Sequence, residues 1–365
     1  MRAVFYSPMA NADTRTPSGV SRMGGLFVGA LRAAGVELEV PSLVRTYQGT
    51  GDALRQAVLR DASKSSANEL ISRIEHCALA RPDFWFSYHV YYKSPDWIGP
   101  LVADALRIPY VVAEGSHAPK RANGAWKLGH GGAAQALVRS DLLLAMTQFD
   151  RVCLDQIAPG RVCDFKPFID AGAFEPAAHS SRQDLPHVLA VGMMRNERKR
   201  QSFRLLAEAL LMLGDIPLRL TIAGDGLSRD EVEGFFTARN AAHDVVFAGA
   251  VDVAAMPGLM ASADIFAWPG LGEAYGLVFL EAQAAGLPVV ACRDRGVPDV
   301  TQEGVTALLS PSGDVAAYAS HLRRLLTQPL LRRSMGESGR RFVLQERSVP
   351  AAAARLMTLL REILP

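Results

Sequence analysis

Short apolar runs rich in β-branched and aromatic residues recur along the first half of the chain. They are RAVFYS, VELEVPS, PDFWFSYH, PYVVAEG and DLLLAM, with DFKPF as a further candidate. Segments with helical spacing, such as SRMGGLFVGALRAAG and DWIGPLVADALR, lie between most of them. Continuous apolar strands that alternate with amphipathic helices are typical of βαβ units, and so predict a parallel sheet covered on both faces.

The second half repeats this alternation. Its apolar runs are HVLAVG, LRLTIAG, DVVFAGA, DIFAWP and LPVVAC, and helical stretches such as FRLLAEALLML separate them. Between the halves, a segment rich in Ala, Ser, Pro and charge has no apolar period, which predicts a linker. The sequence therefore predicts an α/β protein with two doubly wound domains, and a final helix that either completes the second domain or crosses back to the first. The predicted segments are 1–168, the linker 169–185, 186–343 and the final helix 344–365.

Composition restricts the class of protein. A chain of 365 residues with 49% hydrophobic content suits two domains of ordinary size. Its 39 basic and 37 acidic residues nearly cancel, so we expect no nucleic-acid partner and only local recognition of phosphate. The four cysteines form no CxxC pair, and neither a leader nor a membrane-spanning run is recognisable, so we expect a cytoplasmic protein.

The stretch GEAYGLVFLEAQAAGLPVVA carries two glutamates around a predicted helix start. Glu273 falls in the loop that leaves the strand DIFAWP, and Glu281 falls in the early turns of the helix. Unpaired amides at a helix N-terminus suit a diphosphate, while the carboxylates could bind neutral hydroxyl groups of the same ligand. The alternative is that Glu281 only complements the helix dipole and Glu273 is a solvated charge. The loop and first turn comprise Tyr275, Gly276, Leu277 and Val278.

A basic segment follows the strand HVLAVG, also at a carboxyl end. MMRNERKR holds Arg195 and Lys199, which could bind a phosphate and stabilise the charge on a departing one, although a solvated loop would have the same composition. Gly224 lies in a tight turn at another strand end, after LRLTIAG. Ligands of parallel sheets bind at the carboxyl ends of strands, so two facing sheets would place a site in the cleft between them.

The first domain offers three candidates. Gly19 follows the loop after RAVFYS and would let the backbone approach a ligand, or it is only a turn glycine beside a capping Ser18. Glu114 lies at the end of the run PYVVAEG and His117 just after it, and either could contact a reacting sugar, although a lone histidine beside a strand end is more often structural. GHGGAA, residues 129–134, resembles a dinucleotide fingerprint but lies in a loop-like region that follows no strand. We expect no metal, cofactor or covalent nucleophile.

Three segments together resemble the retaining GT-B glycosyltransferases of family four, also called glycosyl transferases group 1. They are EAYGLVFLEAQAAGLPVVA with its Glu-x7-Glu spacing, AVGMMRNERK, and IAGDG followed by ADIFAWP. The resemblance implies two Rossmann-like domains. It departs from the family at Met193, where an arginine is common, at Ser18-Gly19, where the family has two glycines, and at the strand-end histidine, which would fall nearer Gly115 than His117.

By this resemblance, the protein moves a hexosyl unit from a nucleoside-diphosphate sugar to a hydroxyl of a saccharide or lipid-linked acceptor, with retention and front-face attack. Glu273 would bind the donor sugar, Glu281 the ribose, and Arg195 with Lys199 the phosphates. The residues themselves suggest one further contact: the aromatic and basic side chains of the first-domain loops HVYYKSPDW and APKRANGAWKLGH could meet a sugar or the anionic inner membrane surface, or form only a solvated rim. Two alternatives are a nucleotide-sugar epimerase of the same fold and a non-catalytic protein that binds nucleotide sugars.

Overall fold

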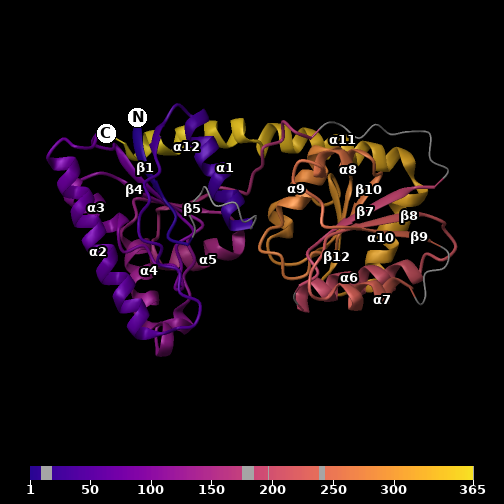
Figure 1. Ribbon diagram of the computed structural model, residues 1–365. Coiled ribbons are helices and arrows are strands. Elements are labelled where there is room, and N and C mark those ends of the chain that lie inside the picture. Colours follow the sequence, from indigo (N-terminus) through magenta and orange to yellow (C-terminus); the bar gives the residue numbers. More distant parts are fainter. Residues whose placement is uncertain (10–18, 175–184, 196, 238–242, 365) are drawn as a thin grey trace. The chain divides into compact units, whose positions relative to one another are not determined.

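The computed structural model describes residues 1–9, 19–174, 185–195, 197–237 and 243–364 (Figure 1). Its contacts divide the chain into two compact units. The first unit combines Met1–Lys166 with Val349–Pro365, and the second is Pro167–Ser348. The predicted linker 169–185 overlaps residues 175–184, which lie outside the described part.

The first unit is built on a six-stranded parallel sheet with the order β2-β1-β3-β4-β5-β6. Its central strands are fully buried and consist of the apolar runs that the sequence pattern predicts. The last strand ends where the run DFKPF begins. The strands are β1 (Arg2–Tyr6), β2 (Glu37–Glu39), β3 (Phe84–Tyr88), β4 (Tyr110–Ala113), β5 (Leu142–Ala145) and β6 (Val162–Asp164).

Helices cover both faces of this sheet, and the alternation of side chains along β1 shows how. Val4 and Tyr6 join the apolar cluster that contains residues of α2, α3 and α4. Phe5 points to the other face and stacks on Phe86 with ring centroids 5.6 Å apart, and Phe27 of α1 packs on Phe86 at 5.5 Å. The helices are α1 (Gly19–Ala33), α2 (Ala53–Glu75), α3 (Gly99–Leu106), α4 (Lys127–Arg139) and α5 (Gln148–Ile157), with the short η1 (Pro119–Arg121) and η2 (Gly124–Trp126).

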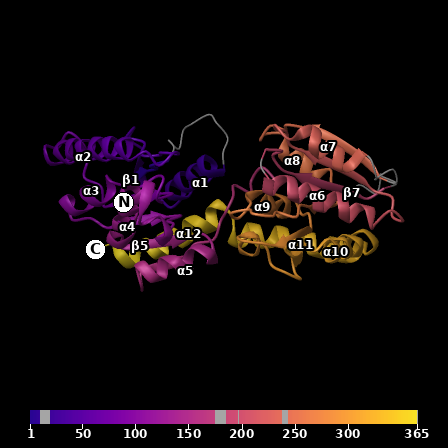
Figure 2. The same cartoon turned by 90° about the horizontal axis from the view of Figure 1, so that it is seen from below.

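The final helix belongs to the first unit, although its sequence follows the second. In both views α12 (Val349–Ile363) lies beside α1, against which it packs (Figures 1 and 2). The two chain segments that join the units run next to each other, because the amide of Ile169 donates to the carbonyl of Arg347 at 2.8 Å. The last helix therefore belongs to the first unit, where it packs against α1.

The second unit has a second parallel sheet, with the order β12-β11-β10-β7-β8-β9. Five of its strands coincide with predicted runs, and β12 is an additional one. They are β7 (His187–Val191), β8 (Arg219–Ala223), β9 (Asp244–Gly249), β10 (Ile265–Ala267), β11 (Val289–Arg293) and β12 (Ala307–Pro311).

Helices of the second unit connect these strands. Among them α11 packs against α9, where the backbone at Gly339 lies close to the side chain of Gln283. Within the described residues, no helix combines the length and hydropathy needed to cross a bilayer. The helices are α6 (Glu197–Leu211), α7 (Arg229–Thr237), α8 (Met256–Ala261), α9 (Leu277–Ala284), α10 (Val315–Thr327) and α11 (Pro329–Glu346), with the short η3 (Val297–Asp299).

Candidate functional site

Four neighbouring strands of the second unit end in the loops that carry most of the predicted site. The strands β11, β10, β7 and β8 lie side by side and parallel, so their carboxyl ends meet at one edge of the sheet. Two loop contacts hold this edge together. The amide of Gly272 donates to Oδ2 of Asp294 at 2.7 Å, and that of Met194 donates to the carbonyl of Asp225 at 2.9 Å.

Gly224 allows two of these loops to touch backbone to backbone. It adopts φ +143°, and a Cβ at this position would lie 1.9 Å from the carbonyl oxygen of Gly192. Its amide donates to the carbonyl of Gly249 at 2.7 Å. Only glycine accommodates this conformation and this proximity. The predicted turn glycine therefore shapes the edge of the sheet where β7 and β8 end.

Lys199 and Glu273 meet in this edge. The ammonium of Lys199 donates to Oε1 of Glu273, and both side chains are largely shielded, being 17% and 15% exposed. The indole of Trp268, which is fully buried, donates from Nε1 to the same carboxylate oxygen at 3.1 Å, and Nζ of Lys199 lies 5.4 Å from the indole centroid. Two predicted site residues that follow different strands, Lys199 after β7 and Glu273 after β10, thus form one hydrogen-bonded cluster beside an indole.

The basic segment differs from its prediction in one respect. The sequence places Lys199 in a loop ahead of a helix, but α6 begins at Glu197, so Lys199 lies in the first helical turn. Arg195 precedes the helix and is exposed. The cation that meets Glu273 is therefore fixed by helical backbone, whereas Arg195 extends from the loop.

The start of α9 has the geometry of an anion-binding helix terminus. Gly276 is its N-cap with φ +72°, and the helix runs from Leu277 without an acidic residue in its first turn. The first amides of a helix have no acceptor within it, and they lie at the positive end of its dipole. Tyr275 before this turn is buried, and Glu281 in the second turn is only 3% exposed. Along the chain, Glu273 precedes the amides of Leu277 and Val278, and Glu281 follows them in the second turn.

The first-domain candidates are placed by β1 and β4. Gly19 is the first residue of α1, whereas Ser18 lies outside the described residues. Glu114 follows β4 directly and has φ +55°, a left-handed conformation that is rare for residues other than glycine. Its carboxylate accepts a hydrogen bond from the hydroxyl of Tyr88, and Nδ1 of His89 lies 3.2 Å from its Oε1.

His89 is a candidate that the sequence pattern did not indicate. It follows β3 as Glu114 follows β4, and it too is left-handed, with φ +65°. Two strained non-glycine residues at the ends of adjacent strands, joined through their side chains, are a feature that accompanies functional sites. The pairing of Tyr88 with Ala113 across β3 and β4 brings them together.

His117 has different surroundings from Glu114. Its ring packs near that of His130, with centroids 5.3 Å apart. Burial, together with the neighbouring His130, lowers the pKa of His117 below its ordinary value of 6.5. His117 is therefore neutral at pH 7 and can both donate and accept a hydrogen bond. The structure pairs Glu114 with His89 rather than with His117.

GHGGAA lies inside α4, so its assignment to a loop was wrong. Gly129 packs closely on the backbone of Tyr92 and Gly132 on the indole of Trp97, and no strand leads directly into the segment, which agrees with its rejection as a dinucleotide motif. Among the described residues, no group of three or more His, Cys, Asp or Glu side chains is arranged to hold a metal ion.

Comparisons with known proteins point to one class of enzyme. The family described as glycosyl transferases group 1 matches residues 185–328, which include the whole loop edge described above. Sulfoquinovosyl transferase SQD2 of Arabidopsis thaliana is 33% identical over 184 residues, which are 47% of this chain and 34% of that protein. D-inositol 3-phosphate glycosyltransferase of Segniliparus rotundus is 28% identical over 319 residues, covering 82% of this chain and 67% of that protein.

A solved structure extends the likeness to both units. Alr3699/HepE of Anabaena in complex with UDP has a TM-score of 0.73 and 14% identity, over 99% of this chain and 100% of that one. At this identity the likeness shows the fold, which is GT-B with two Rossmann-like domains. The matches of this chain span only 34%, 39% and 54% of the length of three curated glycosyltransferases that it resembles.

Proposed function

We propose that this chain is a retaining glycosyltransferase of the glycosyl transferases group 1 family. It moves a hexosyl unit from a nucleoside-diphosphate sugar to a hydroxyl group of a saccharide or lipid-linked acceptor. The observation that carries this proposal is the arrangement of Lys199, Glu273 and the N-terminus of α9 at one sheet edge, with the buried Glu281 in the second turn of that helix. The family match over residues 185–328 supports it.

Different residues at this edge bind different parts of the donor. The first amides of α9, with Lys199 and Arg195, bind the diphosphate. Glu281 accepts hydrogen bonds from the ribose hydroxyls, and Glu273 accepts them from the transferred sugar. In the structure Lys199 pairs with Glu273, so the proposed phosphate ligand and the proposed sugar ligand lie next to each other.

The reaction then needs little covalent participation from the protein. The bond between the anomeric carbon and the phosphate oxygen breaks, and the acceptor oxygen bonds to that carbon on the same face. The acceptor proton passes to the departing phosphate oxygen. Lys199, Arg195 and the helix N-terminus stabilise the charge that develops on this leaving group, which is electrostatic catalysis by preorganised donors. Glu114 or His117 of the first unit contacts the sugar.

A donor-consumption assay tests the proposal. The purified chain is incubated with UDP- and GDP-sugars, with and without a panel of saccharide and glycolipid acceptors. We expect nucleoside diphosphate to accumulate only when an acceptor is present, and proton NMR of the first product to show the anomeric configuration of the donor. An inverted anomeric signal contradicts the retaining assignment.

The same assay separates the two alternatives. A nucleotide-sugar epimerase would change the sugar of the donor without an acceptor, and a binding protein would retain the donor intact. Contact with a membrane surface stays a prediction, which vesicle co-sedimentation of the same preparation checks.

A further inference from the structure

The two oxygens of the Glu273 carboxylate have different surroundings. Oε1 accepts hydrogen bonds from two donors, the ammonium of Lys199 on α6 and the indole N–H of Trp268, whose Nε1 lies 3.1 Å away. Within the described part of the chain, Oε2 accepts no hydrogen bond, and the side chain of Glu273 is 15% exposed. The carboxylate is therefore anchored through one oxygen, and the other oxygen can accept from a ligand.

The indole of Trp268 is held firmly by its neighbours. It is fully buried, and the ring of Phe203 on α6 packs against it edge to face, with centroids 4.8 Å apart. It also lies against the backbone of Gly192, where a Cβ would be 2.7 Å from the indole Cη2. A side chain enclosed at this packing density keeps one rotamer. The direction of the indole N–H is thus fixed by packing.

The loop that carries Glu273 is held at two further points. The amide of Leu271 donates to Oγ of Ser202 at 3.0 Å, and the amide of Gly272 donates to Oδ2 of Asp294 at 2.7 Å. These bonds fix the backbone just before Glu273, but they do not set the torsion angles of its side chain. The indole and the ammonium are the groups that orient the carboxylate itself.

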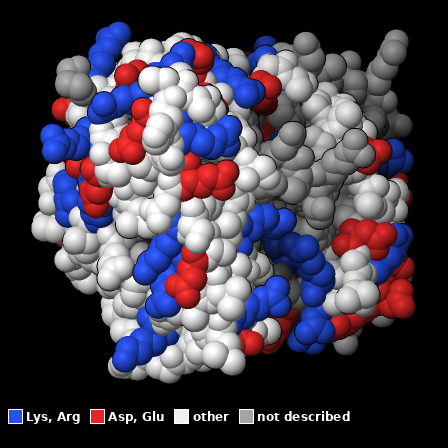
Figure 3. Space-filling view, turned by 60° about the vertical axis from the view of Figure 1, so that its left-hand side comes forward, with Lys and Arg blue, Asp and Glu red and all other residues white. Residues whose placement is uncertain are grey.

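The pair formed by Lys199 and Glu273 differs from an ordinary surface ion pair. Basic and acidic side chains are interspersed over the face of the molecule shown in Figure 3, and exposed ion pairs stabilise a protein little. Lys199 is only 17% exposed, and its ammonium lies 5.4 Å from the centroid of the indole, whose face attracts a cation. One indole therefore contacts both partners, the carboxylate through its N–H and the ammonium through its ring.

We propose that Trp268 is a positioning residue for glycosyl transfer. Its N–H and the ammonium of Lys199 hold Oε1 of Glu273, so that Oε2 accepts a hydrogen bond from a hydroxyl group of the transferred sugar. The role rests on the proposed function, because it concerns the sugar that Glu273 would bind. It adds a residue that touches no substrate and acts only through the carboxylate.

Loss of the indole N–H should affect turnover more than nucleotide binding. A carboxylate that turns away from the sugar leaves the diphosphate with the amides at the start of α9. Misplacing a group by about 1 Å can cost on the order of a hundredfold in rate. We expect Trp268→Phe, which keeps an aromatic ring but has no donor, to lower kcat about tenfold or more and to leave the affinity for UDP or GDP unchanged.

Trp85→Phe is the matched control, because it removes the same kind of bond from another buried position. The indole of Trp85 is fully buried in the first unit and donates from Nε1 to Oγ of Ser87 at 2.8 Å. Both variants lose one buried hydrogen bond and some packing, so their thermal unfolding should shift to a similar extent. Only Trp268→Phe should lose turnover, and unchanged kcat in that variant would overturn the role.

A double-mutant cycle separates action through Glu273 from a general structural effect. If the indole acts by orienting this carboxylate, Trp268→Phe should cost little further turnover in a chain that already carries Glu273→Gln. Losses in kcat that multiply in the double variant would contradict the proposal, because the indole would then act independently of Glu273.

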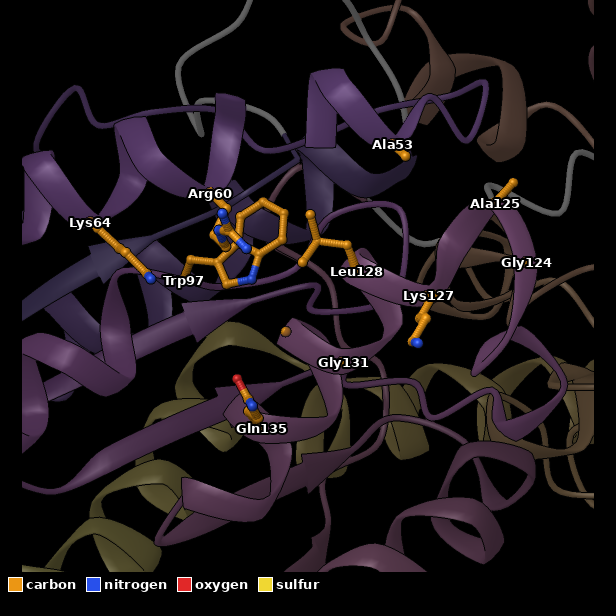
Figure 4. A pocket seen from close by; sticks show the side chains of 11 residues that line it. Ala53, Arg60, Lys64, Trp97, Gly124, Ala125, Lys127, Leu128, Gly131 and Gln135 are labelled. Atoms are coloured by element: carbon orange, nitrogen blue, oxygen red, sulfur yellow. The ribbon is translucent and has the colours of Figure 1, made fainter. Parts of the chain in front are cut away.

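The indole N–H signals of the tryptophans provide a measurement that needs no turnover. The chain has four tryptophans, and Trp268 is the one that belongs to the second unit. Trp97 lines a pocket of about 600 Å³ between α2 and α4 of the first unit (Figure 4). Trp85→Phe, Trp97→Phe and Trp126→Phe assign the three signals of the first unit, so that Trp268 is identified even if its own variant does not fold.

Glu273→Gln should move the indole signal of Trp268 upfield in nitrogen-15 spectra, because a charged acceptor becomes neutral, and should leave the other three signals in place. A Trp268 signal that does not move would overturn the positioning role, whether or not the chain transfers a sugar. A signal that moves in a chain without transferase activity would instead refute the proposed function.

Discussion

The ammonium of Lys199 and the carboxylate of Glu273 form an ion pair beside the indole of Trp268, although 74 residues separate them in the sequence. The pair exists because α6 follows β7, the loop with Glu273 follows β10, and these strands are neighbours. Each partner holds the other at the place where we propose that the donor binds. Removing either one therefore alters both the charge and the position of the one that remains.

Replacing Lys199 by Ala should lower turnover by about a hundredfold, the usual effect of losing one preorganised donor to a leaving group. Arg195→Ala should have a similar effect if its side chain turns to the diphosphate. Steady-state kinetics with a saturating acceptor measures both. Arg204→Ala, on the same helix α6 and in an exposed pair with Glu208, is the matched control and should be unchanged. Full activity of Lys199→Ala would remove the lysine from the phosphate site.

Substitution of Glu273 and substitution of Glu281 should have different effects on turnover and on nucleotide affinity. Glu273→Gln should reduce turnover strongly and leave nucleotide affinity nearly intact, because Glu273 contacts the transferred sugar. Glu281→Gln should weaken binding of the bare nucleoside diphosphate by about 1 to 3 kcal/mol, since it loses charge-assisted hydrogen bonds in a buried position. Calorimetry with UDP and GDP checks both variants, and the reverse pattern would exchange their assigned ligands.

Glu114 and His117 can be distinguished by kinetics and by NMR. We expect Glu114→Gln to lower turnover more than His117→Ala, because Tyr88 and His89 hold the carboxylate in a strained backbone conformation. The pKa of His117 should lie below 6.5 in a proton NMR titration, and His130→Asn should raise it, since a neighbouring ring that can become charged is removed. A pKa of His117 above 6.5 in the unaltered chain would contradict this environment.

Gly224→Ala should destabilise the second unit by about 2 kcal/mol or more, because the new Cβ collides with the carbonyl of Gly192 and the backbone conformation is unfavourable for alanine. Urea unfolding measures the loss. Gly234→Ala in α7 is the control, and it should be neutral or stabilise by up to about 1 kcal/mol, since its Cβ meets nothing and helical glycine is unfavourable. Equal stability of the two variants would show that the loops at β7 and β8 can separate freely.

The strands were predictable from sequence because a parallel strand buried on both faces consists of consecutive apolar residues. The start of α6 was not predictable from sequence, because its first turn is basic. Arg198, Lys199 and Arg200 precede the apolar period of the helix and resemble a solvated loop. The glycines of GHGGAA also favoured a loop, yet packing of Gly132 on Trp97 outweighs their low helix propensity.

The candidate site was also only partly predictable, because some of its contacts depend on tertiary structure and not on local sequence. The rule that ligands bind at strand ends was enough to single out Lys199 and Glu273, which the structure brings into contact. His89 could not be singled out in this way. Its position beside Glu114 depends on the register between β3 and β4 and on two left-handed residues, and neither is visible in the order of apolar and polar residues.

The place of α12 has a consequence for the order of events during translation. Its residues leave the ribosome only after the whole of Pro167–Ser348 has been synthesised, yet they pack on α1 near the beginning of the chain. Domains usually acquire their structure in the order in which they emerge. The second unit can therefore complete its folding before the first unit does. Until the final helix has been synthesised, the surface of α1 against which it packs stays accessible to chaperones.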